Sequence, residues 1–141
     1  GLRTLGASNT GLTAEAIQFV SAMPAWCSLQ TAVLSSNPLC DDGAEFLAAA
    51  ATLPGVLTLR ACEIGAVGLR ALGEAPAVKA LDLRFNPIPA EAWEEAAAAQ
   101  QLPRAQALGA SAQDWSEELV ATITRSYPRV DLIRPASADG P

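Results

Sequence analysis

The clearest pattern in the chain is the spacing of apolar residues between Val78 and Ile88. Within this stretch Leu81 and Leu83 follow Val78 at the fourth and sixth positions, and Asn86 stands at the ninth. Leu81 and Leu83 are two residues apart, which is the period of side chains that share one face of a β-strand. The pattern therefore predicts a short strand and a turn, with the amide of Asn86 turned inward to satisfy backbone groups.

The same spacing recurs along the chain. One further copy is well formed, Leu29, Ala32, Leu34, Asn37 and Leu39. Another falls in the same register, Pro54, Leu57, Leu59, Cys62 and Ile64, with cysteine replacing asparagine, and gains its weight from the fixed period. An earlier and weaker copy consists of Leu2, Leu5, Ala7, Thr10 and Leu12. These copies start at residues 2, 29, 54 and 78, so successive starts differ by 27, 25 and 24 residues. Continuing at this pitch predicts two degenerate copies, Leu102, Ala105, Ala107, Ala110, Ala112 and then Tyr127, Val130, Leu132.

The segments between the predicted strands have the pattern of helices. Residues 13–23 place Ile17, Val20 and Met23 at helical spacing. Other helix starts are indicated by a capping residue followed by an acid, or by a proline in the first turn: Asp42 with Glu45, Asp114 with Glu117, and Pro89 ahead of residues 90–101. Each copy therefore predicts a strand, a turn, a helix and a return to the next strand.

With this spacing and period, the chain resembles the leucine-rich repeat superfamily over residues 2–134. Periods of 24 to 27 residues with helical segments are closer to the ribonuclease-inhibitor-like or cysteine-containing type than to the short bacterial type. The resemblance implies an α/β solenoid shaped as a horseshoe arc, with about five to six repeats. Parallel strands would line its concave face and helices its convex face. Because the last two copies replace leucine by alanine and lack the asparagine, their register stays open, and a terminal cap is the alternative.

Length and composition fit one such domain. The chain has 141 residues, half of them hydrophobic, which is enough for a continuous core. Residues 1–134 form the predicted repeat domain, and residues 135–141 have the composition of a flexible tail. The first residue is Gly, and no cap precedes the first predicted strand. We therefore expect a fragment of a larger protein whose N-terminal edge contacts a neighbouring domain or chain.

The residue types that the chain lacks disfavour an enzyme. There is no histidine, so catalysis by a Ser-His-Asp or Cys-His arrangement is excluded, and no glycine-rich phosphate-binding motif is present. The three cysteines, Cys27, Cys40 and Cys62, have no metal-ligand spacing, and their odd number disfavours a disulfide framework. We expect reduced, mostly buried thiols, no metal and no cofactor. A reducing cytosolic environment is favoured, and the alternative is a secreted effector.

The predicted register places basic residues on the strand side. Arg60 and Arg84 occupy the same position in adjacent copies, next to Asp82. Neighbouring strands lie about 4.8 Å apart, so these side chains would stand together and could clamp a partner's carboxylates. The predicted partner-binding residues are Arg60, Lys79, Asp82, Arg84, Phe85 and Arg104. The alternative is that the arginines and Asp82 only neutralise one another on a solvated sheet.

These observations favour a protein-interaction module that binds a partner with an acidic surface through the concave face. It would belong to an effector, a scaffold or an assembly subunit. One alternative is a structural spacer within a complex. A weaker one is a leucine-rich-repeat GTPase activator, with Arg60, Arg84 or Arg104 acting on a phosphate. The sequence pI of about 4.5 disfavours nucleic acid. The chain contains no run of 18 apolar residues, so the sequence predicts no membrane-spanning helix.

Overall fold

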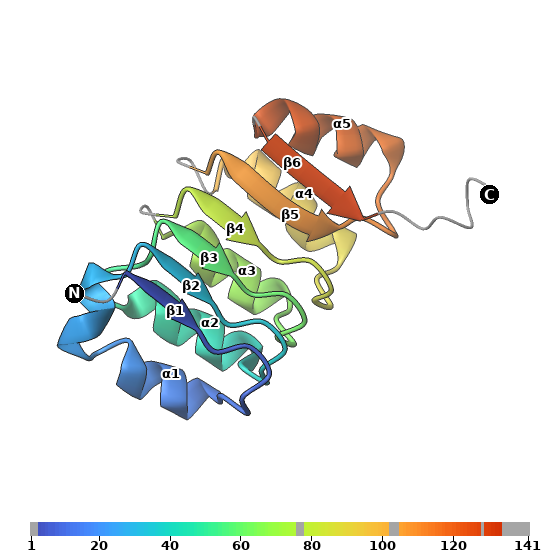
Figure 1. Cartoon of the computed structure of the whole chain (residues 1–141). Coiled ribbons are helices and arrows are strands. Elements are labelled where there is room, and N and C mark those ends of the chain that lie inside the picture. The colour runs from blue at the N-terminus through green and yellow to red at the C-terminus, as the bar shows by residue number, and fades with distance from the viewer. Residues whose placement is uncertain (1–2, 76–77, 102–104, 128, 134–141) are drawn as a thin grey trace.

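The structure, a computed structural model, describes residues 3–75, 78–101, 105–127 and 129–133. Within these residues it is an α/β fold with one six-stranded parallel sheet and five α-helices (Figure 1). The α/β class and the parallel sheet predicted from the sequence are confirmed. The strands lie side by side in chain order: β1 (Thr4–Gly6), β2 (Thr31–Val33), β3 (Val56–Thr58), β4 (Ala80–Asp82), β5 (Ala107–Ser111) and β6 (Arg129–Ile133).

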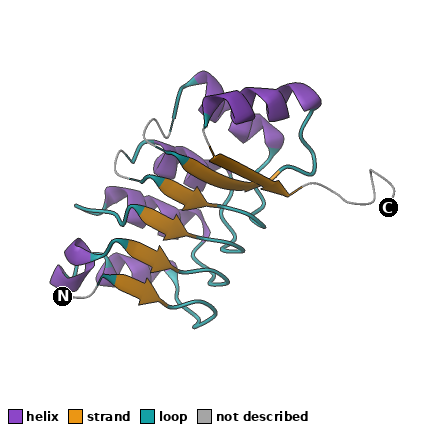
Figure 2. Ribbon diagram, turned by 45° about the horizontal axis from the view of Figure 1, so that its top comes forward, coloured by secondary structure: helices purple, strands orange, loops and turns teal. Residues whose placement is uncertain are grey.

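The helices connect consecutive strands and pack beside one another. They are α1 (Ala14–Val20), α2 (Cys40–Ala49), α3 (Ala66–Gly73), α4 (Ala90–Ala98) and α5 (Glu117–Ser126), with a short 3₁₀ helix, η1 (Pro24–Ser28), between α1 and β2. The helices α1 to α4 lie behind the sheet, and α5 lies beside β6 at its far end (Figures 1 and 2). None of the helices in the described ranges is long and apolar enough to cross a membrane.

The core lies between the sheet and the helices. The middle residues of β2, β3 and β4, Ala32, Leu57 and Leu81, are buried there, because alternate side chains of a strand face opposite sides. Trp93 of α4 and Trp115, in the loop before α5, are also buried, with ring centroids 5.5 Å apart. Both tryptophans therefore belong to the core.

Two buried asparagines bind the turns that follow the strands. The Asn37 side chain accepts hydrogen bonds from the backbone N–H groups of Thr10 (3.0 Å) and Leu12 (2.9 Å), and it donates to the carbonyl of Ala7 (2.8 Å). The Asn86 side chain makes the matching set two strands further along the sheet. It accepts from Cys62 and Ile64 and donates to Leu59 and Leu83, at 2.7 to 3.1 Å. The inward role predicted for these asparagines is confirmed.

The register predicted for the fifth strand is wrong by three residues. Leu81 of β4 pairs with Leu108, where the constant pitch placed Ala105. The segment between α4 and β5 lengthens this step to 27 residues, so Leu108 and Ala110 take the core-facing strand positions that were predicted for Ala105 and Ala107. A leucine buries more apolar area than an alanine, so the shifted register stabilises the strand more. For β6, Val130 lies at the strand position predicted from the sequence, but it pairs with Leu108 and not with Ala105.

Helix starts and thiols also differ from expectation. Asp42 lies inside α2, which begins at Cys40 without a side-chain cap. The α5 helix is capped by Ser116, whose hydroxyl accepts from the Leu119 N–H (3.1 Å), so Asp114 is not its cap. The prediction that the cysteines are mostly buried is wrong, because Cys27 and Cys40 are exposed and only Cys62 is buried.

Candidate functional site

The sheet has one face that the helices do not cover. We call it the open face (Figures 1 and 2). It carries the residues on either side of the core-facing residue that each strand pairs in register with Leu81, and these residues align in two rows. The first row is Thr4, Thr31, Val56, Ala80, Ala107 and Arg129, and the second is Gly6, Val33, Thr58, Asp82, Gly109 and Asp131. Side chains in these rows are the ones that the fold presents to a partner.

Between β3 and β6 the open face is hollowed. The hollow has a volume of about 410 Å³ and opens to solvent. It exists because β4 and β5 present the small residues Ala80, Ala107 and Gly109 in the two rows. Larger side chains stand on either side, Val56 on β3 and Arg129 on β6. A drop in side-chain size at neighbouring positions thus creates a concave, largely apolar site.

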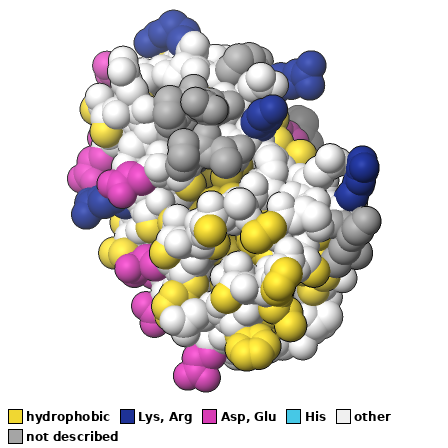
Figure 3. All heavy atoms as spheres, turned by 90° about the vertical axis from the view of Figure 1, so that its left-hand side faces the viewer, with side chains coloured by type: hydrophobic (Ala, Val, Ile, Leu, Met, Phe, Trp, Pro, Cys, Tyr) yellow, Lys and Arg dark blue, Asp and Glu magenta, His cyan; other side chains and the backbone are white. Residues whose placement is uncertain are grey.

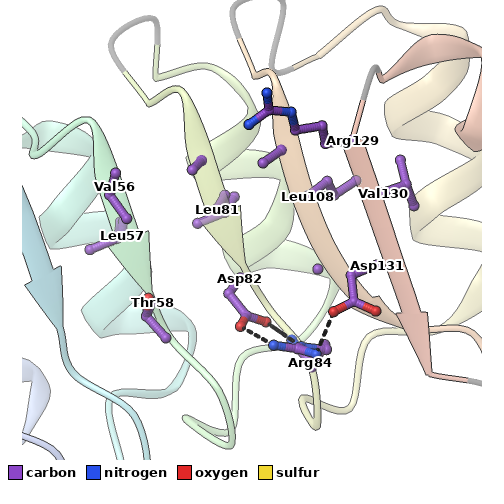
Figure 4. Close-up of a pocket in the computed structure, with 13 residues that line it drawn as sticks. Val56, Leu57, Thr58, Leu81, Asp82, Arg84, Leu108, Arg129, Val130 and Asp131 are labelled. Carbon is purple, nitrogen blue, oxygen red and sulfur yellow. Dashed lines mark hydrogen bonds and ion pairs between the residues drawn. The ribbon is translucent and has the colours of Figure 1, made fainter.

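An ion-pair network closes one end of the hollow (Figure 4). The guanidinium of Arg84 donates to both carboxylate oxygens of Asp82, at 3.0 Å from Nε and 2.8 Å from Nη2. Its Nη1 donates to Asp131 at 2.8 Å, and Arg60 Nε donates to Asp82 at 2.5 Å. The side chains of Asp82 and Arg84 are only 17% and 15% exposed, so this pair is held rigidly.

Gly109 makes the network sterically feasible. A Cβ at this position would stand 2.5 Å from Oδ1 of Asp82 and 3.2 Å from Nε of Arg84. Both distances are shorter than van der Waals contact, so any larger residue would push the pair apart. The sequence signal for this role is weak, since the predicted register did not place Gly109 on the open face.

Because of this network, the positive charges of Arg60 and Arg84 in the predicted basic patch are neutralised. Arg60 and Arg84 contribute two positive charges, and Asp82 and Asp131 contribute two negative charges, so the four cancel. All three guanidinium nitrogens of Arg84 already donate to carboxylates. This is the arrangement of the alternative raised from the sequence, in which the arginines and Asp82 neutralise one another.

Arg129 stands at the other end of the hollow and extends over β5 (Figure 4). Across the part of the chain that the structure describes, it forms no ion pair. It was not among the partner-binding residues predicted from the sequence. The available signal was its place in the same row as Ala80, which identifies it as an outward-facing cation.

The remaining predicted residues do not line the hollow. Lys79 is exposed and directly precedes β4. Phe85 lies beyond β4 with a φ of +65° and 55% exposure, and its N–H donates to the Ser111 hydroxyl (2.7 Å). Arg104 lies outside the described residues, and its predicted place in the first row is taken by Ala107. The six predicted residues therefore do not form one contiguous patch in the described structure.

A second apolar surface lies at the β1 and α1 end of the molecule. Phe19 is 70% exposed and Met23 is 44% exposed, and hydrophobic side chains gather on this end (Figure 3). Both residues line a hollow beside α1 together with Ala22 and Pro24. This is the region where the sequence predicted contact with a neighbouring domain or chain.

The thiols are poorly suited to nucleophilic chemistry. Burial raises the pKa of Cys62. The pKa of Cys40 is also raised, by desolvation first and then by the negative charges of Glu63, Asp41 and Asp42. A raised pKa leaves less of the reactive thiolate at neutral pH. Among the described residues, no group of three or more His, Cys, Asp and Glu side chains is arranged to hold a metal ion.

Comparison with known proteins supplies no further assignment: no protein-family model matches the sequence, and no curated protein is similar to it.

Proposed function

We propose that this chain is a leucine-rich repeat domain that binds a partner protein through the open face of its sheet. Three features support the repeat assignment: the recurring apolar spacing, the parallel strands in chain order, and the matching hydrogen bonds of Asn37 and Asn86. In this assignment the open face is the concave side of the horseshoe arc. Each strand, turn and helix is one repeat, and Cys62 replaces the asparagine of the third.

The hollow between β3 and β6 is the observation that carries the binding role. It combines an apolar lining that includes Val56 and Ala107 with fixed polar groups at Asp82 and Arg84, a combination typical of recognition sites. Rigid side chains lose little conformational freedom on binding, which favours affinity. The partner is another protein, and the chain serves an effector, scaffold or assembly rather than catalysing a reaction.

A structural spacer is the second candidate. The internal neutralisation of Arg60, Asp82 and Arg84 favours it, because a solvated sheet face needs no more than this. We do not propose GTPase activation, since the guanidinium of Arg84 is already committed to two carboxylates.

Site-specific photo-crosslinking separates the two candidates. A photoreactive residue is placed at Thr58 on the open face and, as a matched control, at the exposed Ala98 on α4. Both proteins are incubated with an extract of the natural source. A binding module gives a discrete adduct from position 58 that is lost when Ala107→Arg fills the hollow. Adducts of equal yield from both positions would instead favour the spacer.

A further inference from the structure

We propose that the hollow accepts an aliphatic side chain from an extended internal segment of the partner, while an acidic side chain two positions away in that segment pairs with Arg129. This inference rests on the proposed function and specifies the chemistry of the partner.

The walls of the hollow favour an aliphatic group. Its floor is formed by the methyl groups of Ala80 and Ala107 and the backbone at Gly109, none of which offers a charge. Val56 forms one side and is 41% exposed in the free protein, which is high for a valine next to a core. An aliphatic side chain that enters the hollow removes this apolar surface from water, and that transfer favours binding.

Charge complementarity selects the acidic neighbour. At one end of the hollow, the carboxylates of Asp82 and Asp131 are already bound by Arg84. At the opposite end Arg129 has no ion-pair partner among the described residues, and Lys79, just before β4, is also exposed. The N-terminal ends of these strands therefore carry uncompensated positive charge, and a guanidinium binds a carboxylate with two parallel hydrogen bonds.

The geometry of the face favours an internal segment over a chain end. On the β2 side, the open face continues with the neutral residues Thr31 and Val33, and no described element covers it. A bound chain can therefore continue past the hollow over β2. In an extended segment, side chains two positions apart share a face and are separated by about 6.6 Å. Arg129 and Asp131 have the same separation in sequence along β6, so one acidic and one aliphatic residue span the site.

Selection from a library of short linear peptides of random sequence tests the proposal. The full chain is immobilised, and each retained peptide is then tested for binding to the Ala107→Leu variant. We expect the retained peptides to share Asp or Glu two positions from Leu, Ile, Val or Met. A synthetic peptide of this kind should lose about tenfold in affinity for Ala107→Leu. Thr4→Leu, a matched change in the same row but outside the hollow, should leave its affinity unchanged.

A charge swap tests the ion pair. Arg129→Glu should weaken binding of the acidic peptide, and replacing the acidic residue of the peptide by Lys should restore binding to this variant only. The proposal is overturned if no peptide is retained, if the retained peptides lack the acidic residue, or if the swap restores nothing. Peptides that bind the open face without using the hollow would contradict this inference and leave the proposed function intact. Peptides that bind only the helical side would contradict both.

Discussion

At the scale of single residues, the absence of a side chain at Gly109 determines the electrostatics of the open face. Asp82 and Arg84 approach closely because nothing stands between them on β5. Arg60 and Asp131 pair with these two residues in turn, so the arrangement of four charged side chains depends on one glycine. This dependence can be tested independently of any partner.

Gly109→Ala should destabilise the chain by about 1 kcal/mol, because the new Cβ would displace the carboxylate of Asp82. The measurement is the free energy of unfolding in urea. In an Asp82→Ala background the same substitution should cost close to nothing, because the clashing carboxylate is absent. An equal cost in both backgrounds would show that Gly109 acts through something other than the ion pair.

Asn86 contributes to the stability of the fold through buried hydrogen bonds that water cannot replace. It is 8% exposed, and its amide bonds backbone groups on both sides of the turn. Asn86→Ala leaves these groups unpaired and should lower the free energy of unfolding by about 2 to 4 kcal/mol. Gln113→Ala is the control, since Gln113 is exposed and follows Leu108 by the same number of residues as Asn86 follows Leu81. Equal losses from the two substitutions would contradict the role given to Asn86.

At the scale of elements, one helix is capped by its neighbour. The α3 helix has no side-chain cap of its own, since Gly65 precedes it. Asp41 of α2 supplies the acceptor instead, and its Oδ1 accepts from the N–H groups of Gly65 (2.7 Å) and Gly68 (2.9 Å). Gly68 leaves room for this carboxylate, because a Cβ there would lie 2.7 Å from Oδ1. Adjacent helices are thus joined by a polar contact as well as by packing.

Asp41→Ala should therefore destabilise the chain by about 1 kcal/mol, the usual cost of losing a helix cap. Backbone hydrogen exchange should rise at Gly65 and Gly68 and stay unchanged in α5, which carries its own cap at Ser116. Asp42→Ala is the matched control, because Asp42 is exposed on the same helix. Increased exchange in the control, or none in Asp41→Ala, would argue against the cross-helix cap.

At the scale of the whole molecule, the buried side chains of Cys62 and Tyr127 make the stability of the fold sensitive to alkaline pH. Burial raises the pKa of Cys62 above its ordinary 9.0 and that of Tyr127 above 10.0. Below the lower of these values both groups are protonated in the folded and the unfolded chain, and their contribution to stability is complete. As pH rises further, the unfolded chain ionises first, so this contribution is lost.

The free energy of unfolding should accordingly fall as pH rises above about 9. Urea unfolding at neutral pH and at alkaline pH measures the effect. The Cys62→Ala variant, which cannot ionise at this position, should lose less stability over the same interval. If its loss equals that of the natural chain, the buried thiol is not responsible.

Much of the fold follows from local pattern. The alternation of Leu57 with Leu59 and of Leu81 with Leu83 predicts strands with one buried face, and Asn37 and Asn86 mark the turns. The fifth strand was misplaced because residues 102–112 offer alanines at many spacings, and a constant pitch cannot choose among them. The candidate site was predicted less well, because Gly109 and Arg129 acquire their roles only from neighbouring strands.

The sequence by itself determined the α/β class, the order of strands and helices, and the inward asparagines, since each depends on side-chain alternation and spacing within a few residues. The tertiary structure alone decided the register of β5, the pairing of Arg84 with Asp82 and Asp131, and the hollow between β3 and β6. Contacts between strands join residues more than 20 positions apart, as Arg60 and Asp82 show. Their distances depend on how loops adjust the register, and no local pattern encodes that adjustment.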